Sequence, residues 1–519
     1  MALPTIVNIS PRITACSVKR WAELKLRGYS LSSPRVLCLL ALLASDLRPP
    51  IARLSLPAFL IQRYHHAMPD YITLPEQRVP VVAECDVLVV GGGAAGMSAA
   101  IAAARQGADV VLVERYGYLG GLASGGLIVL LLTLDDGDGH QIIAGQCQEL
   151  VERLQARGAC FYPPHEEWGN YDEALVEKYR RWGLVWGAGP HRVRYSVAYD
   201  PEEFKFVANT WVAEAKVRLM YHRWATDVIV DGVTPLPPSP PLPQGARGEH
   251  HDANPSSISH VIFTSKAGRQ AVRAAYVIDA TGDGDVFTMA GERSEKEQIH
   301  PWLWFRMSGV SDVDAAQAVR NGFFFRTVKP GQVLMPWGAA ERIERRIDAT
   351  DPDDLTFAEV ECRRMVMDEV DRLRAQVPGF EDAYLTDVAL TLGVTESRRL
   401  DGAYTLARDD ANRVFDDTIA STGHWTKYGA VYHIPYRSLL PRNVSNLLVA
   451  GRCISVDHRV HHATKEIPPA FATGEAAGIA AVHALRAASS VQGVDVGALQ
   501  ASLRAAGGWL PEGAQAHHG

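Results

Sequence analysis

The sequence has few cysteines and none of the close pairs that hold metals or redox-active disulfides. Its seven cysteines are Cys16, Cys38, Cys85, Cys147, Cys160, Cys362 and Cys453, and no two of them form a Cys-x-x-Cys pair. This removes the usual ligand spacing of a structural zinc or an iron–sulfur cluster, so we expect no metal centre. An odd number of scattered cysteines fits a reducing compartment better than a disulfide framework, which predicts a cytoplasmic protein.

Long apolar runs and blocks of positive charge are also lacking. No stretch approaches the roughly 20 apolar residues that a membrane-spanning helix needs. The net charge of -7, without any Lys/Arg run, argues against a nucleic-acid partner. What is present is an ordinary globular composition, with 47% hydrophobic and 21% charged residues. At 519 residues the chain is too long for a single core, so we expect two structural domains.

The N-terminal region leaves two interpretations open. The short apolar run at 36–44 follows several basic residues, as in a signal peptide, but Ser45-Asp46-Leu47-Arg48 is a poor cleavage site. Alternatively, residues 1–67 are a mis-annotated or dispensable extension, because Met68 begins a short polar lead-in to the first strong strand. We exclude this segment from the interpretation of the fold.

The first strong pattern is one strand–turn–helix–strand unit. An apolar run at 85–90 (CDVLVV) predicts a buried parallel strand. Three glycines follow, then an alanine-rich helix over 94–105 and a second buried strand over 109–114 (DVVLVE). This order is typical of a βαβ unit.

The turn in this unit carries a nucleotide-binding fingerprint. Gly91, Gly93 and Gly96 occupy the three positions of GxGxxG. These glycines allow a tight turn, close approach of the backbone to a pyrophosphate, and close packing of helix on strand. Glu114 lies 18 residues after Gly96, near the spacing of a ribose-binding carboxylate. The alternative is an ordinary turn with a surface Glu, but the context predicts dinucleotide binding.

Three further segments rich in small residues bear on which dinucleotide is bound, because NAD and FAD folds share this fingerprint. They are 115–124, 277–285 and 447–480. With these segments the sequence resembles the FAD-dependent oxidoreductases related to the fumarate reductase and succinate dehydrogenase flavoproteins. The resemblance covers most of 84–485 and rests on ERYGYLGG (114–121), IDATGDGD (278–285), GVTESRRLDG (393–402), IPYRSLLP (434–441) and NLLVAGRCIS (446–455).

The resemblance implies an α/β fold with a two-dinucleotide-binding-type FAD domain. This domain is Rossmann-like and discontinuous, with an inserted cap or substrate domain. The expected parts are an N-terminal extension (1–83), the first part of the FAD domain (84–294) with a Pro-rich insertion (231–260), the cap (295–430), the second part of the FAD domain (431–490) and a C-terminal tail (491–519).

The resemblance also implies the residues that contact FAD. Gly91, Gly93, Ala94 and Gly96 would hold the pyrophosphate, with Glu114 and Arg115 at the adenosine ribose. The other expected contacts are Gly121, Leu122, Ala123, Trp224, Ala280, Gly282, Gly451, Arg452 and Pro468, the last in a helix whose N-terminus faces the flavin. Nothing resembles the histidine that binds flavin covalently in succinate dehydrogenase, so we expect non-covalent FAD.

The expected catalytic residues are His458, His462 and Arg399. The segment 457–462 is rich in titratable groups, and a histidine there suits a general base that takes a proton during hydride transfer. The alternative is that these are loop histidines without a catalytic role. Arg399, like Arg398, could clamp a substrate carboxylate, although an ion pair with Glu396 or Asp401 is the simpler expectation.

The expected activity is hydride transfer between a small organic substrate and flavin N5, as in a dehydrogenase or oxidase. One alternative is reduction of an activated C=C bond, and another is a flavin-binding electron-transfer subunit of a larger complex. We find no second GxGxxG after a strand, so no NAD(P)H domain is expected. A homo-oligomer and an electron-accepting partner both stay open.

Overall fold

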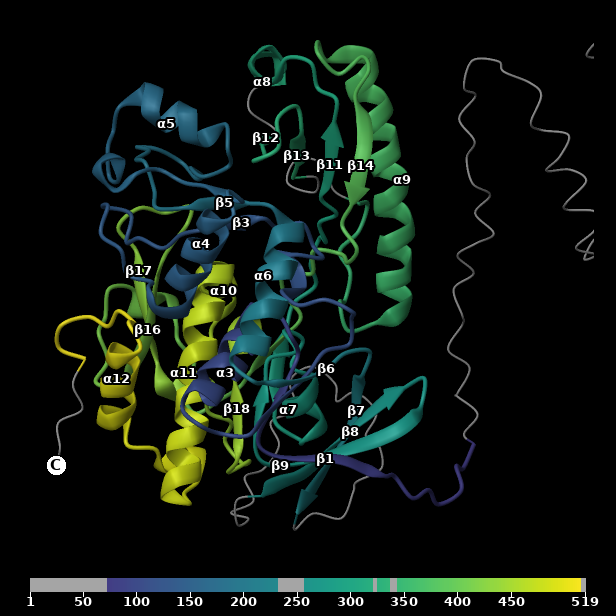
Figure 1. Ribbon diagram of the computed structural model, residues 1–519, viewed down its shortest axis with the longest axis vertical. Coiled ribbons are helices and arrows are strands. Elements are labelled where there is room, and N and C mark those ends of the chain that lie inside the picture. The colour runs from purple at the N-terminus through teal and green to yellow at the C-terminus, as the bar shows by residue number, and fades with distance from the viewer. Residues whose placement is uncertain (1–71, 232–255, 321–323, 337–342, 515–519) are drawn as a thin grey trace, which may run out of the picture. The chain divides into compact units, whose positions relative to one another are not determined.

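The computed structural model describes residues 72–231, 256–320, 324–336 and 343–514 (Figure 1). Its main sheet has seven strands in the order β6-β2-β1-β9-β8-β7, and β18 pairs with β9. The strands are β1 (Val81–Val90), β2 (Val110–Val113), β6 (Arg218–Met220), β7 (Trp224–Asp231), β8 (Ser257–Ser265), β9 (Gly268–Asp279) and β18 (Leu447–Val449). Strands β6, β2, β1, β9 and β18 are mutually parallel, which confirms the expected α/β class (Figure 1).

The predicted βαβ unit forms the centre of this sheet. β1 and β2 pair in parallel, and α3 (Ala94–Arg105) connects them. The two strands pair from Val87 opposite Val110 to Val90 opposite Val113, and the Val and Leu side chains of these paired residues are buried. Burial on both faces explains why these strands read as continuous apolar runs in the sequence.

Helix α11 (Ile467–Ala487) packs closely on α3. A Cβ at Gly474 would lie 2.2 Å from the carbonyl oxygen of Ala95, and one at Gly478 would lie 2.3 Å from that of Ala99. Glycine at these two positions therefore lets the helix backbones come closer than any side chain would allow. The contact joins a helix late in the described chain to the helix that follows β1.

The Pro-rich insertion interrupts an antiparallel hairpin. β7 and β8 pair from Trp224 opposite Thr264 to Asp231 opposite Ser257. Residues 232–255, most of the expected insertion, lie outside the described residues. The expected insertion limit of 260 is wrong, because Ser257 to His260 are paired strand residues of β8.

A second set of strands follows between 294 and 400. β11 (Phe305–Ser308) pairs antiparallel with β13 (Val333–Met335) and β14 (Tyr384–Val388), and β12 (Phe325–Arg326) adds to β13. The 25-residue α9 (Pro352–Gln376) runs beside this sheet (Figure 1). Asp351 caps α9 by accepting from the amide of Asp353, with Pro352 in the first turn. The limits expected for a cap domain stay a prediction.

The remaining elements connect these two sheets or flank them. The strands are β3 (Leu130–Leu131), β4 (Cys160–Phe161), β5 (Val197–Tyr199), β10 (Ser294–Lys296), β15 (Arg398–Leu400), β16 (Thr418–Gly423) and β17 (Val431–Pro435). The helices are α4 (Gly145–Ala156), α5 (Glu173–Arg180), α6 (Pro201–Glu214), α7 (Asp285–Met289), α8 (Val313–Arg320), α10 (His458–Thr464) and α12 (Val496–Ala505). The short 3-10 turns are η2 (Gly121–Ala123), η3 (His165–Glu167), η4 (Arg408–Asp410), η5 (Tyr436–Leu439), η6 (Gly451–Cys453) and η7 (Val491–Gly493).

Both expected terminal limits need correction. β1 begins at Val81, inside the segment assigned to an N-terminal extension, and the interpretations offered for residues 1–67 lie outside the described residues. The expected C-terminal tail contains α12, whose Leu499 and Leu503 are buried. This helix is short, but its apolar residues recur at a helical spacing and pack as part of the core.

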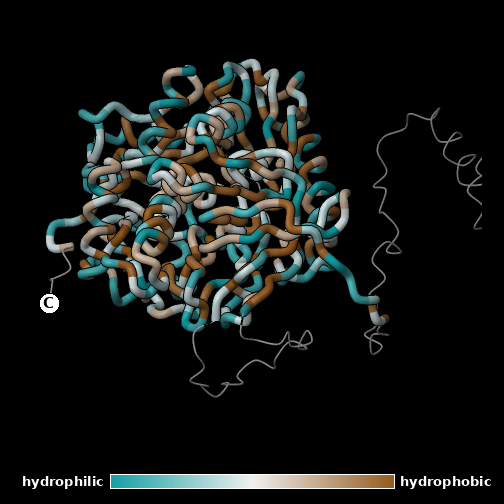
Figure 2. Tube along the Cα trace, turned by 60° about the horizontal axis from the view of Figure 1, so that its bottom comes forward, coloured by the Kyte–Doolittle hydropathy of each residue, from teal (hydrophilic) through white to brown (hydrophobic). Residues whose placement is uncertain are grey.

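Apolar segments run through the interior of the described residues, and polar segments lie toward their surface (Figure 2). None of the helices in the described ranges is both long and apolar enough to cross a membrane.

Candidate functional site

A cavity of about 450 Å³ lies at the carboxyl ends of the parallel strands β1, β2, β9 and β18. In an open α/β sheet this edge is where nucleotides bind. Most of the residues expected to contact FAD line it: Gly91, Gly93, Ala94, Glu114, Arg115, Gly121, Leu122, Ala123, Trp224, Ala280, Gly282, Gly451 and Arg452.

The glycine turn has the geometry that the fingerprint predicts. Gly91 has φ +99°, and a Cβ there would lie 2.4 Å from the carbonyl oxygen of Ala280. A Cβ on Gly93 would instead meet no atom within 4 Å. Gly93 precedes α3, whose first turn carries no acidic side chain and whose N-cap makes no side-chain bond. The open space and the amide-rich helix start fit a pyrophosphate.

Two of the expected contact residues do not line the cavity. A Cβ on Gly96 would lie 1.7 Å from the carbonyl oxygen of Gly91, so this glycine serves helix-on-strand packing. Pro468 is buried, and its neighbours Ile467 and Ala470 line the cavity instead. Residues three apart share a helix face, whereas Pro468 is turned about 100° away from Ile467. At the start of α11 the cavity is therefore lined by Ile467 and Ala470, and the expected contact of Pro468 with FAD stays a prediction.

Glu114 is buried at the end of β2, and its carboxylate organises the turn. It accepts hydrogen bonds from the amide of Gly92 at 2.6 Å and from that of Tyr116 at 2.7 Å. Burial raises the pKa of Glu114, although these two amides and Arg115 oppose the rise. The carboxylate thus fixes the glycine turn and also faces the cavity, where a ribose hydroxyl can donate to it.

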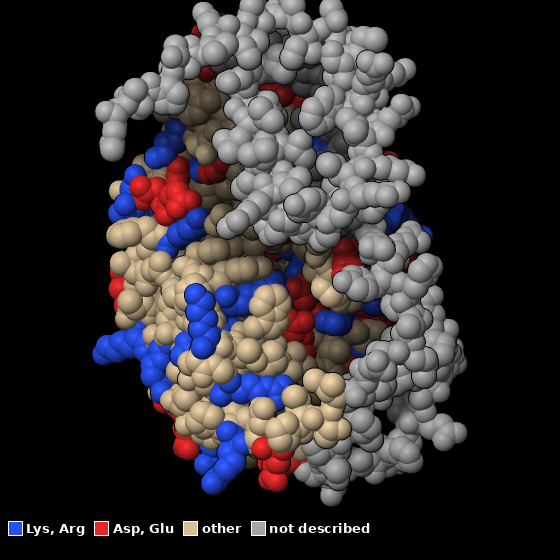
Figure 3. All heavy atoms as spheres, turned by 90° about the vertical axis from the view of Figure 1, so that its right-hand side faces the viewer, with Lys and Arg blue, Asp and Glu red and all other residues tan. Residues whose placement is uncertain are grey.

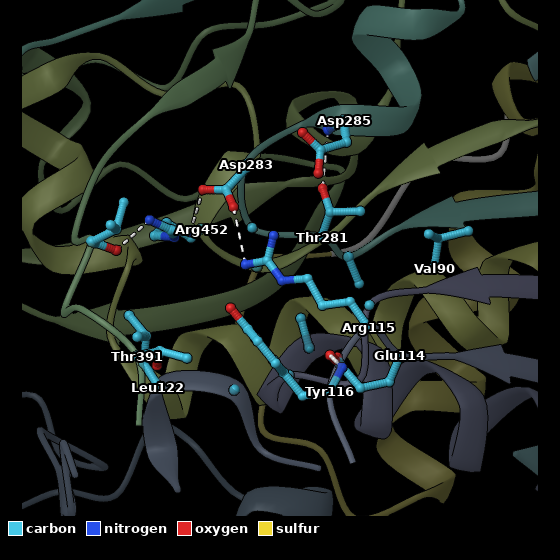
Figure 4. A pocket seen from close by; sticks show the side chains of 18 of the residues that line it. Val90, Glu114, Arg115, Tyr116, Leu122, Thr281, Asp283, Asp285, Thr391 and Arg452 are labelled. Atoms are coloured by element: carbon cyan, nitrogen blue, oxygen red, sulfur yellow. Dashed lines mark hydrogen bonds and ion pairs between the residues drawn. The ribbon is translucent and has the colours of Figure 1, made fainter. Parts of the chain in front are cut away.

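Asp283 joins two arginines across the cavity wall. Its carboxylate lies 2.8 Å from Nη2 of Arg452 and 3.4 Å from Nη2 of Arg115, which reach it from different sides (Figure 4). The Arg115 guanidinium also lies 5.0 Å from the ring centroids of both Tyr116 and Trp224. Burial raises the pKa of Asp283, but Arg452 and Arg115 outweigh it and hold that pKa below its usual range.

Several lining residues were not predicted from the sequence. Asp283 and Asp285 stand within a motif that was recognised, next to Ala280 and Gly282. In contrast, the segments around Thr350, Leu355 and Thr391 come from the region of α9 and β14 and carry no motif. The sequence does not reveal these residues, because only the tertiary structure brings the start of α9 and the segment after β14 to the cavity.

A second cavity, of about 680 Å³, adjoins the first, and Lys465 lines both. It is lined by Gln298, Ile299, His300, Trp302, Arg346, Thr395, Glu396, Arg408, His424, Lys427, His458, Arg459, His461, His462 and Lys465. The cavity therefore combines five histidines, five cations and one carboxylate. Two expected catalytic residues, His458 and His462, are among them.

His458 and Glu396 form a histidine–carboxylate pair. Nδ1 of His458 lies 2.9 Å and 3.1 Å from the two carboxylate oxygens, and the imidazole is 59% exposed. His458 begins α10, which Asp457 caps through the amide of Val460, so His461 and His462 lie on this helix and not on a loop, which was their alternative interpretation. Burial tends to raise the pKa of Glu396, yet His461, His458 and Arg399 lower it to about 2.

Arg399 does not reach the second cavity. Its residue is 1% exposed; Nε donates to Glu396 at 2.8 Å and Nη1 to the carbonyl oxygen of Val456 at 2.5 Å. The ion pair with Glu396, the simpler expectation, is confirmed, whereas Asp401 pairs with Arg293 and Arg442. Because the guanidinium is buried and already engaged, Arg399 as a substrate clamp is wrong.

The other histidines of α10 have different surroundings. His461 is buried, with Nε2 2.9 Å from the carbonyl oxygen of Arg452. His462 faces the cavity with its ring 4.9 Å from that of Trp425. Surrounding protein, followed by the charges of Lys465 and His424, lowers the pKa of His462 to about 3. A base with so low a pKa is poorly matched to work near neutral pH.

Charge on the visible surface is mixed: Lys, Arg, Asp and Glu side chains are interspersed on the face shown in Figure 3. Within the described ranges, no group of three or more His, Cys, Asp or Glu side chains is arranged to hold a metal ion.

The parallel sheet, the glycine turn and the acidic end of β2 together define a dinucleotide-binding α/β enzyme. A family model described as FAD dependent oxidoreductase matches residues 86–503. The chain belongs to this family of FAD-dependent oxidoreductases, and FAD is its cofactor.

Individual relatives are more distant. A 37-residue stretch, 7% of the chain, is 62% identical to the 4-oxocyclohex-2-ene-1-carboxylate 5-dehydrogenase of Sinomonas cyclohexanicum and covers 6% of that enzyme. The p-nitrophenol 4-monooxygenase structure from Pseudomonas putida is 12% identical, with 79% of this chain and 83% of that chain covered and a TM-score of 0.43. For the glycine oxidase structure from Geobacillus kaustophilus the values are 14%, 80%, 98% and 0.41.

Proposed function

We propose that the chain transfers hydride between a small organic substrate and FAD, with the substrate in the second cavity. The observation that carries this proposal is the junction at Lys465, where the nucleotide cavity adjoins a cavity lined by histidines. We also propose that the finer relationship is to the fumarate reductase and succinate dehydrogenase flavoproteins, as the shared motifs suggest.

The first cavity would hold FAD non-covalently. Gly93 and the start of α3 would receive the pyrophosphate, and Glu114 the adenosine ribose, with Arg115 and Trp224 beside the adenine half. The 121–123 turn and the start of α11 would approach the flavin. When bound, FAD supplies the site that accepts or donates two electrons.

His458 would act as the general base. Its Nδ1–H donates to Glu396, so the neutral ring carries its lone pair on Nε2, and the exposed side chain can present that nitrogen to a substrate. When a substrate C–H bond beside a heteroatom is oxidised, its hydrogen would leave with the electron pair as hydride to FAD, and His458 would take the proton from the heteroatom. His462, whose pKa is lowered to about 3, is the weaker candidate.

A screen of small organic compounds under nitrogen tests this proposal. Loss of the oxidised flavin absorbance identifies a substrate, and rapid reoxidation by an enoate but not by air would favour the alternative, a C=C reductase. With an identified substrate, His458→Ala should slow flavin reduction by about 10²–10⁴-fold.

The control is His165→Ala, because His165 is an exposed histidine whose ring packs against that of Trp168. Equal rates in His458→Ala and the parent would refute the base assignment. A chain that binds FAD but turns over no compound without a second protein would support the other alternative, an electron-transfer subunit.

A further inference from the structure

His424 presents a different kind of imidazole to the second cavity from His458. It follows β16, is 2% exposed, and lines the cavity. Its own backbone is held on both sides: its amide donates to Ala430, and its carbonyl accepts from the amide of Lys427. These backbone bonds form a tight turn that also includes Trp425 and Thr426.

The tautomer of His424 follows from its partner. The backbone amide of Thr426 lies 3.3 Å from Nδ1 of His424, and the Thr426 hydroxyl lies 3.2 Å from the same atom. A backbone amide can only donate, so Nδ1 is an acceptor and the ring proton is on Nε2. Nε2–H has no hydrogen-bond acceptor within the described part of the chain, and the residue borders the cavity.

The charges around His424 keep this ring neutral. Arg194 comes from the segment before β5, Lys427 from the turn after β16, and Lys465 from the end of α10. The ring of His462 lies 5.5 Å from that of His424. Burial first, and then these three cations, lower the pKa of His424 to about 4. Protonation at Nδ1 would also break the bond from Thr426.

We propose that His424 is a catalytic hydrogen-bond donor whose Nε2–H stabilises negative charge on a substrate oxygen next to the reacting carbon. This inference rests on the proposed function, and it names the substrate class: a compound whose oxygen becomes an alkoxide or enolate during reaction, such as an alcohol or a conjugated carbonyl. His424 transfers no proton and no electrons. The base remains His458, and Lys427 and Lys465 add positive potential at the same wall.

The two histidines thus differ in which ring nitrogen carries the proton, because their hydrogen-bond partners differ. Glu396 accepts from Nδ1–H of His458 and leaves it a free lone pair, whereas Thr426 donates to Nδ1 of His424 and leaves it a free N–H. A ring with a free lone pair suits a general base, and a ring with a free N–H suits a hydrogen-bond donor.

Substituted phenols test the donor without a known substrate, because a phenolate oxygen carries the charge that an alkoxide or enolate would carry. The probe is 4-chlorophenol, titrated into the FAD-loaded protein and followed by flavin absorbance and by tryptophan fluorescence. We expect it to bind as the phenolate. His424→Phe keeps a ring but removes the donor, and should weaken binding by at least 10-fold. His424→Gln keeps a non-titrating N–H and should bind within about 3-fold of the parent.

His165→Phe serves as the matched control and should bind like the parent. Equal binding in His424→Phe and the parent would overturn the proposal, as would loss of binding in His424→Gln equal to that in His424→Phe. Failure of the parent to bind any phenol would also overturn it, while flavin reduction in the substrate screen would still support the proposed function.

A second measurement needs no variant. In protein labelled with ¹⁵N-histidine, the His424 imidazole should appear at pH 7 as the neutral Nε2–H tautomer. An imidazolium, or the Nδ1–H tautomer, would contradict the proposal even if the variants failed to fold.

Discussion

At the scale of single residues, the glycine turn shows two separate requirements that the fingerprint combines. Gly91 needs both a positive φ and the absence of a Cβ, whereas Gly93 needs only open space above it. The sequence identified all three glycines, and it named His458 as a catalytic candidate, which stays a prediction. It could not identify His424, because the proposed role of that ring depends on its tautomer, which follows from the contact of Nδ1 with Thr426 in the structure.

Gly91→Ala should cost more than the penalty of a left-handed backbone alone. That penalty is about 1–2 kcal/mol, and the added methyl would also strike the carbonyl of Ala280. Gly107→Ala is the matched control, because Gly107 has φ +92° but no atom within 4 Å of an added Cβ. Urea unfolding should rank the parent first, then Gly107→Ala, then Gly91→Ala, with FAD binding lost only in the last. Equal destabilisation would show that the close approach to Ala280 is unimportant.

Glu396 should make stability depend on pH in the acid range. Its pKa is about 2 in the folded chain against 4.5 for an unperturbed Glu, so its charge stabilises the fold above pH 4.5. That contribution, up to roughly 3 kcal/mol, is lost as pH falls from about 4.5 toward about 2. The difference in stability between the parent and Glu396→Gln should shrink over this window.

The control for this prediction is Glu84→Gln, which removes an exposed pair with Arg273 at 3.6 Å. Such surface pairs contribute about 0–1 kcal/mol, so little change is expected at any pH. A constant difference between parent and Glu396→Gln from pH 7 to pH 3 would contradict the assigned pairing.

At the scale of elements, what could be predicted was local. The βαβ unit was found because its two apolar runs, its alanine-rich helix and its glycine turn lie within one stretch of sequence. The second sheet was not found, because its short strands pair across long separations, as Phe305 does with Val388. The second cavity is likewise assembled from six separate segments between Gln298 and Lys465, and of these only the histidine-rich 457–462 was expected to form a catalytic site.

A substitution in the contact of α3 with α11 should lower the stability of the apoprotein, whereas a substitution on the cavity side of the glycine turn should lower FAD affinity alone. In Gly474→Ala the new methyl would meet the Ala95 carbonyl at 2.2 Å, so the helices must separate and both thermal stability and FAD affinity should fall. In Gly93→Ala the methyl enters open space on the cavity side, so FAD affinity should fall while the melting temperature of the apoprotein is unchanged. The same effect of both variants on the apoprotein would contradict this division.

At the scale of the whole molecule, the fold joins a nucleotide cavity, lined by segments between Val90 and Ala470, to a histidine cavity, lined by segments between Gln298 and Lys465. α11 closes onto α3, and α10 lies immediately before α11, so the histidines of α10 are brought to the edge of the nucleotide cavity through Lys465. Loading FAD should therefore stabilise the molecule as a unit, by about 2.7 kcal/mol at a free concentration one hundred times Kd.

The most direct measurement is the visible spectrum of the purified chain after incubation with FAD and removal of the excess. We predict the absorption bands of oxidised flavin at about one FAD per chain, and release of that flavin into solution when the protein is precipitated with acid, since no covalent link is expected. A chain that stays colourless, although it is folded and its melting temperature does not respond to FAD, would contradict the account.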